Sequence, residues 1–90
     1  MKNLKLKLIR QKIDNLDDKL LNLIKIRTNL VNGVLKQKKY KSQIIDKVRI
    51  KEILKLVKKK SISRKIDPKI TKKIWKNIIG AYIDFEKRNF

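Results

Sequence analysis

The stretch "LIRQKIDNLDDKLLNLIKIR", residues 8–27, predicts a long amphipathic helix. Its apolar residues, continued beyond the stretch, recur at steps of three and four, which places them on one helical face. They are Ile13, Leu16, Leu20, Leu23, Leu30 and Val34. Arg27 falls in the middle of this face. A buried cation at such a position calls for an anionic partner, because an unpaired charge removed from water costs several kcal/mol.

The periodicity along the whole chain predicts an all-α fold of three helices. We expect them at about residues 4–39, 44–60 and 68–88. The third has a clear start, since Asp67 is a good N-cap and Pro68 fits the first helical position. No stretch has the alternating pattern of a strand. We expect residues 1–90 to form one domain.

Composition excludes several classes of enzyme. The 90 residues include no cysteine and no histidine, which removes disulfides, thiolate metal sites and histidine-based catalysis. We therefore expect no metal-dependent catalysis. No apolar run approaches the roughly 18 residues of a membrane span, and the first residues do not resemble a signal peptide. We expect a cytoplasmic protein without a membrane partner.

The length of the first helix predicts a second subunit. About 36 helical residues span roughly 54 Å at 1.5 Å each. A compact monomer of this size is only about 30 Å across, so the chain cannot cover its own apolar stripe. Burying two such stripes against each other costs less than exposing both. We expect an intertwined homodimer.

The net charge of +19 raises an alternative from another class, a basic helical nucleic-acid-binding protein. That alternative predicts arginines and lysines on an exposed face and a salt-dependent affinity for DNA or RNA. It does not predict Arg27 and Lys38 on an apolar stripe. The lysine excess also has a simpler cause, since AT-rich coding produces lysine, isoleucine and asparagine together. We therefore do not expect nucleic acid as a partner.

Several cations are predicted to point inward from the first two helices. At about 100° per residue, Arg27 and Lys38 lie about 20° apart on the apolar arc of the first helix. Arg10 lies at the edge of that arc, near the other end of the helix. On the second helix, Arg49 borders the apolar arc and Asp46 falls on it.

The third helix places Tyr82 on its apolar stripe and Glu86 one turn later on the flank. One interpretation is a structural salt-bridge network, in which Asp46 and Glu86 neutralise Arg27 and Lys38. The inward cations outnumber the inward acids, however. The remaining positive charge fits a small dianionic ligand, which arginine and lysine bind well.

Three segments together resemble the all-helical type II chorismate mutases. They are "IRQKIDNLDDKLLNLIKIRTNLVNGVLKQK", "DKVRIKEIL" and "IDPKITKKIWKNIIGAYIDFE", which cover nearly the whole chain. The family pattern has an arginine near the start of the first helix, a second arginine after a leucine-rich run, and a lysine eleven residues later. A D-x-x-R sequence then opens the second helix. Here these elements are Arg10, Arg27, Lys38, and Asp46 with Arg49.

The resemblance implies intertwined three-helix dimers with two identical pockets, each completed by the amino-terminal arginine of the other subunit. The implied reaction is the rearrangement of chorismate to prephenate, in aromatic amino acid biosynthesis, without any cofactor. Arg27 and the partner's Arg10 would hold the two carboxylates of the substrate. Lys38 and Glu86 would stabilise the negative charge that develops on the ether oxygen. Glutamate donates a hydrogen bond only when protonated, so we expect either that burial keeps Glu86 protonated or that activity favours acidic pH.

The remaining substrate-binding positions implied by the resemblance are Asp46, Arg49, Ile50 and Tyr82. Two of them depart from the family pattern, which usually has glutamate where this chain has Ile50 and often a small serine where it has Tyr82. The related isochorismate-pyruvate lyases share the fold and often lack that glutamate, so a lyase is the first alternative. A catalytically silent dimer is another, if Ile50 and Tyr82 close the pocket.

Overall fold

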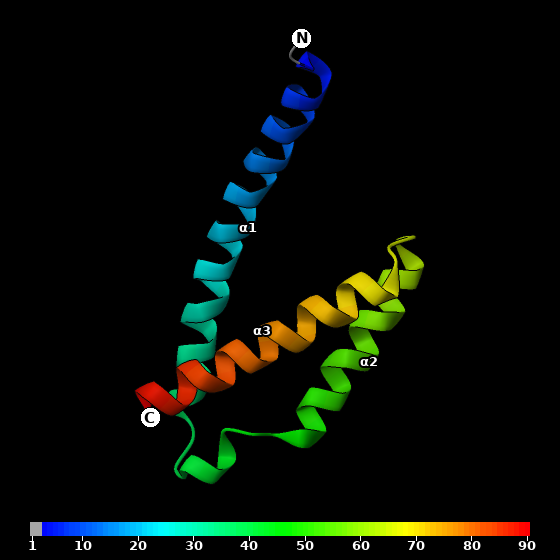
Figure 1. Cartoon of the computed structure of the whole chain (residues 1–90). Coiled ribbons are helices and arrows are strands. Elements are labelled where there is room, and N and C mark those ends of the chain that lie inside the picture. The colour runs from blue at the N-terminus through cyan, green and yellow to red at the C-terminus, as the bar shows by residue number, and fades with distance from the viewer. Residues whose placement is uncertain (1–2) are drawn as a thin grey trace. The chain divides into compact units, whose positions relative to one another are not determined.

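The computed structural model describes residues 3–90, and every regular element in that range is helical (Figure 1). The elements are α1 (Leu4–Lys36), the short 3-10 helix η1 (Lys41–Gln43), α2 (Lys47–Ser63) and α3 (Pro68–Asn89). The prediction of an all-α chain with three helices is confirmed. The chain forms two compact units, Met1–Val31 and Asn32–Phe90, with the boundary inside α1.

The segment between the first two helices differs from the prediction. The first helix ends at Lys36 instead of residue 39, and the second begins at Lys47 instead of residue 44. Just after α1, backbone amides donate to carbonyls three residues back, as in a 3-10 turn. Lys38 N, for example, donates to the Leu35 carbonyl at 3.1 Å. Lys38 therefore lies beyond the helix on which its inward direction was predicted.

The first unit consists of the amino-terminal part of α1. None of its described residues, 3–31, is buried in the single chain. The apolar face predicted from the sequence is largely open to solvent: Leu16 is 57% exposed, Leu20 53% and Leu30 67%. Among residues 3–90, no helix combines the length and the apolar character that crossing a membrane requires.

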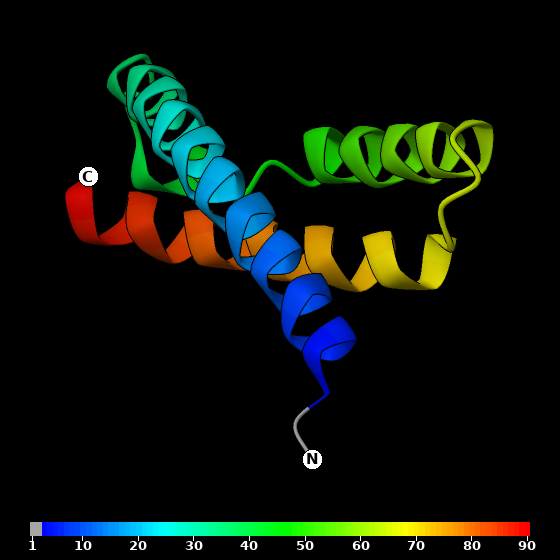
Figure 2. The same ribbon diagram turned by 90° about the horizontal axis from the view of Figure 1, so that it is seen from above.

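The second unit contains the end of α1, η1, α2 and α3. Helices α2 and α3 pack against each other as an antiparallel pair, seen side by side in Figure 2. The turn between them includes Lys65, whose φ of 58° lies in the left-handed region. Asp67 then caps α3 by accepting from Lys69 N at 2.9 Å, and Pro68 is the first helical residue. The predicted start of the third helix is confirmed.

A buried pair of hydroxyl groups joins α2 to α3 near this turn. Ser61 is 2% exposed and Thr71 8%, and their oxygens lie 2.7 Å apart. Each hydroxyl also has a carbonyl acceptor on its own helix, Val57 O at 2.6 Å from Ser61 and Pro68 O at 3.3 Å from Thr71, so either can be the donor between the two helices. Such a bond contributes net stability only while both partners are present, because a lone buried hydroxyl keeps its desolvation cost.

Replacing Thr71 with valine keeps the side-chain shape and removes this bond. We expect the variant to lower the free energy of unfolding by about 1–3 kcal/mol, because it leaves the buried Ser61 hydroxyl without its partner on α3. Urea denaturation followed by circular dichroism measures the change. The exposed Ser63→Ala variant is the control and should change stability by less than about 0.5 kcal/mol. Equal effects of the two variants would contradict the assignment.

Candidate active site

The second unit brings together two residues that lie 48 positions apart, Lys38 and Glu86. Lys38 follows α1 and Glu86 lies near the C-terminal end of α3. The Lys38 Nζ atom donates to both Glu86 carboxylate oxygens, at 3.1 and 3.4 Å. Their side chains are only 17% and 8% exposed. Of the predicted ion pairs, this one is present, and it is shielded enough from water to hold a fixed geometry.

A backbone carbonyl also holds the Lys38 ammonium. Ile44 O accepts from Nζ at 3.5 Å, and Ile44 itself is only 3% exposed. Its buried side chain anchors the segment between α1 and α2. The ammonium is thus positioned by one group on α3 and one on its own connecting segment.

The side chain of Gln43 also stabilises this connecting segment. Its side-chain oxygen accepts from Lys39 N at 2.7 Å and from Tyr40 N at 3.0 Å. These two amides follow Lys38 directly, so the bonds fix the direction in which the backbone leaves it. Gln43 was not predicted from the sequence. A capping box, with glutamine three residues after the N-cap, could have indicated this role. Here the N-cap of η1 is Tyr40, which is not a usual N-cap residue, so the capping box is hard to recognise in the sequence.

Asp46 and Arg49 take different places from those predicted. Asp46 lies outside α2 as its N-cap, and its carboxylate accepts from Arg49 N at 3.0 Å. The Arg49 side chain is 62% exposed and pairs with Glu52 at 3.5 Å. The inward direction expected for Arg49 is therefore wrong for the single chain. Periodicity misplaced Asp46 because its carboxylate is bound by a helix-end amide, a preferred arrangement for aspartate.

Lys38 and Asp46 line the same hollow, which has a volume of about 530 Å³. The remaining lining residues are Gln43, Ile45, Lys47 and Val48. This volume lies within the range of small-molecule sites. The hollow places a cation, a carboxylate and apolar surface around one space.

The other predicted site residues lie on three helices. Ile50 on α2 and Tyr82 on α3 are half-buried, and the Tyr82 ring meets Phe85 edge to face at 6.3 Å. In the first unit, Arg27 is half-buried on α1 and Arg10 is exposed. The partial burial of Arg27 agrees with its predicted place on the apolar face.

Comparison with known families supplies the identity of this arrangement. The family model described as chorismate mutase type II matches residues 9–87. The chain belongs to this family. The match crosses both compact units and includes all of the predicted site residues. Comparisons with curated proteins and with solved structures give no significant match.

Membership of the chorismate mutase type II family confirms the resemblance that the sequence indicated. It makes the chain an enzyme, an isomerase that acts on chorismate without a cofactor. Neither the number of subunits nor the role of any single residue follows from the match alone.

The arrangement of Gln43 predicts an effect on the rate of prephenate formation. If Lys38 has the catalytic role that the resemblance implies, we expect Gln43→Ala to lower kcat about tenfold and to change KM little, because a displaced Lys38 would lose its alignment with the reacting atoms. Gln43→Glu keeps an oxygen acceptor for the two amides and should restore most of the rate. Steady-state kinetics measures both. The neighbouring Ser42→Ala is the control, and a loss of the same size in Gln43→Glu would contradict the positioning role.

Proposed function

We propose that the chain rearranges chorismate to prephenate in a cationic pocket that includes Lys38 and Glu86. The observation that supports this most is the buried contact between these two side chains, at 3.1 Å. The reaction is unimolecular and needs no nucleophile. It can therefore proceed by fixing the substrate in a reactive shape and stabilising the charge that develops.

Lys38 would stabilise the ether oxygen as its bond to carbon breaks. Negative charge builds on that oxygen in the transition state, and a cation already fixed in a dry pocket needs no rearrangement to meet it. In the free chain the ammonium faces Glu86 and the Ile44 carbonyl. The ether oxygen would enter beside this pair and accept a hydrogen bond from the Lys38 ammonium, while Glu86 keeps that ammonium in place.

The carboxylates of the substrate require further cations. By analogy with the family, Arg27 would bind one carboxylate and the partner's Arg10 the other, so that the reacting carbons approach each other. Asp46, Arg49, Ile50 and Tyr82 would surround the ring and its hydroxyl. The exposed Arg49 would exchange Glu52 for the substrate, at little cost because an exposed ion pair contributes little.

The proposed enzyme is a homodimer in which residues 1–90 act as one domain. The support comes from α1, whose apolar residues remain exposed in the single chain. Contiguous apolar surface of this kind marks an interface in most proteins. A second copy offers the same stripe in return, as symmetric dimers do. A cytoplasmic location stays a prediction.

Substitution of Lys38 tests the proposed reaction. We expect wild-type protein to form prephenate from chorismate and Lys38→Ala to lose at least about 100-fold in kcat, because the transition-state charge loses its cation. Product chromatography measures this, with the exposed Lys41→Ala as the control. The same assays with isochorismate test the alternative reaction. Pyruvate and salicylate with little prephenate would identify a lyase, and no turnover of either compound would indicate a silent dimer.

Mixing two inactive variants tests whether the pocket is shared between subunits. Arg10→Ala and Arg27→Ala should each be nearly inactive alone. After refolding in equal amounts, half of the dimers are mixed, and in each mixed dimer one pocket carries both substitutions and the other none. We expect about one quarter of the wild-type activity to return, by this symmetry argument.

The control for this experiment mixes Arg27→Ala with Lys38→Ala. Both residues would come from the same chain, so no mixed dimer contains an intact pocket and no activity should return. Recovery in the control, or its absence in the first mixture, would contradict the proposed sharing of the pocket.

A further inference from the structure

Positive charge is concentrated on the part of the chain that forms the α2–α3 turn. Residues 53–76 contain ten cations and a single acid, Asp67. The carboxylate of Asp67 is already bound to the amide of Lys69. The segment stands out by its number of lysines and arginines, ten in 24 residues, whereas the whole chain has 27 in 90.

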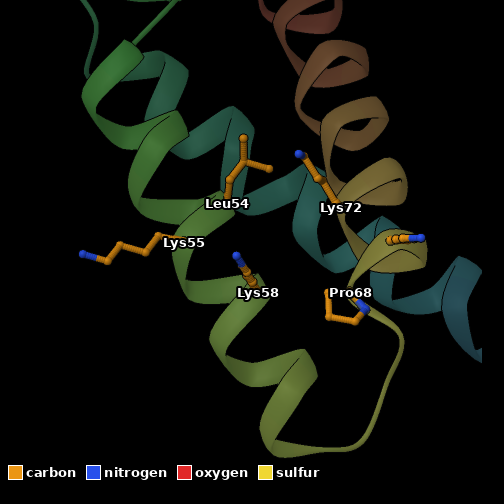
Figure 3. Close-up of a pocket in the computed structure, with 6 residues that line it drawn as sticks. Leu54, Lys55, Lys58, Pro68 and Lys72 are labelled. Carbon is orange, nitrogen blue, oxygen red and sulfur yellow. The ribbon is translucent and has the colours of Figure 1, made fainter.

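These lysines line two adjoining hollows between and beside α2 and α3. The first has a volume of about 420 Å³ (Figure 3). Its lining consists of Leu54, Lys55, Lys58, Pro68, Lys69 and Lys72. Leu54 and Lys72 point toward each other across it, whereas Lys55 extends outward from α2 (Figure 3). The second hollow, about 320 Å³, is lined by Lys69, Lys72, Lys73 and Lys76. Lys69 and Lys72 line both hollows. We call the two adjoining hollows together the lysine track.

Among residues 3–90, no carboxylate lines the lysine track. The ion pairs Lys38–Glu86 and Arg49–Glu52 both lie outside it. The first turn of α3 also lacks an acidic residue. At the N-cap before that turn, however, the Asp67 carboxylate accepts from Lys69 N and offsets the positive end of the helix dipole. The lysines repel one another, and a bound anion would relieve that repulsion.

The chemistry of the lysine track favours phosphate groups over nucleotide bases. Lysine is a point charge suited to phosphate, and it reads base edges less well than the planar fork of arginine. In the described part of the chain, no aromatic side chain lines the track, so it offers no stacking platform for bases. On α3 the lysines at 69, 72, 73 and 76 extend over about 10 Å, more than one phosphate covers. We propose that the lysine track binds the phosphate backbone of nucleic acid without reading its sequence.

The lysine track is separate from the catalytic pair. Pro68 and Glu86 are 18 residues apart on one helix, which corresponds to about 27 Å. Thr71 and Glu86 are buried in α3, whereas Lys69, Lys72 and Lys73 are exposed. The sequence led us not to expect nucleic acid, on the basis of the inward cations. The exposed lysines of α2 and α3 are a second set, and they meet the criterion stated for that alternative.

Salt dependence of binding to a short DNA duplex of mixed sequence tests the proposal. Fluorescence anisotropy gives the dissociation constant over a series of salt concentrations. Each phosphate contact contributes about −0.9 to the slope of log K against log salt, so contacts by all six lysines predict a slope of about −5. Duplexes of different sequence should bind equally. A strong sequence preference, or a wild-type protein that does not bind, would overturn the proposal.

Matched triple variants separate the lysine track from the overall charge. Lys69→Gln, Lys72→Gln and Lys73→Gln together should reduce the slope by about two to three and weaken binding at least tenfold. The control replaces Lys12, Lys19 and Lys25 of α1 with glutamine, which removes the same charge from residues outside the track. It should weaken binding less than threefold. Equal losses would mean that the +19 charge acts diffusely and would overturn the proposal.

Charge-preserving variants and a lipid surface complete the test. Arginine at positions 69, 72 and 73 keeps the charges and should keep the binding, so a loss there would contradict a phosphate contact. Both glutamine triples should keep the helical circular dichroism and the rate of prephenate formation, since neither touches the proposed catalytic residues. Vesicles of phosphatidylserine are the competing anionic surface. Binding to vesicles in place of the duplex would overturn the choice of nucleic acid.

Discussion

A buried charge must meet an opposite charge, and the organisation of the second unit depends on this constraint. Lys38 and Glu86 come from the segment after α1 and from the end of α3, and their contact joins the two. Removing either partner would leave a charge in a largely dry environment, which is far more costly than a lost surface pair. In the proposed reaction the same requirement would suit the pair to catalysis, because a cation held by weakly solvated neighbours needs no rearrangement to meet a substrate oxygen.

The sequence predicted the helices well and the connecting segment poorly. Helical periodicity and the Asp67–Pro68 start depend on local spacing, which one chain displays directly. The conformation of segment 37–46 depends instead on the side-chain oxygen of Gln43, which accepts hydrogen bonds from two backbone amides. Extrapolating the helical angle to Lys38 therefore used a helix that had already ended. The pairing of Lys38 with Glu86 was nevertheless predictable, because inward cations need inward acids.

Asp46 and Arg49 show a second limit of reasoning from periodicity. Both belong to a recognisable family pattern, yet one serves as a helix cap and the other lies in solvent in the single chain. A pattern of residue types identifies the family and its reaction. It does not tell whether a side chain faces its ligand before the ligand or a second subunit is present. The lysines near the α2–α3 turn were not predicted to form a site for a related reason. Their arrangement around a common hollow appears only when the helices are packed.

The small core of the chain has a consequence for its heat stability. Among the described residues, the buried apolar side chains are Leu35 and Ile44, whereas Leu16, Leu20 and Leu30 of α1 are open to water. So little apolar burial cannot balance the entropy lost when 90 residues become ordered. In the proposed homodimer, folding and assembly would be one event, and the melting temperature would rise with protein concentration. Dilution would then unfold this protein, as a denaturant unfolds a protein that is stable as a monomer.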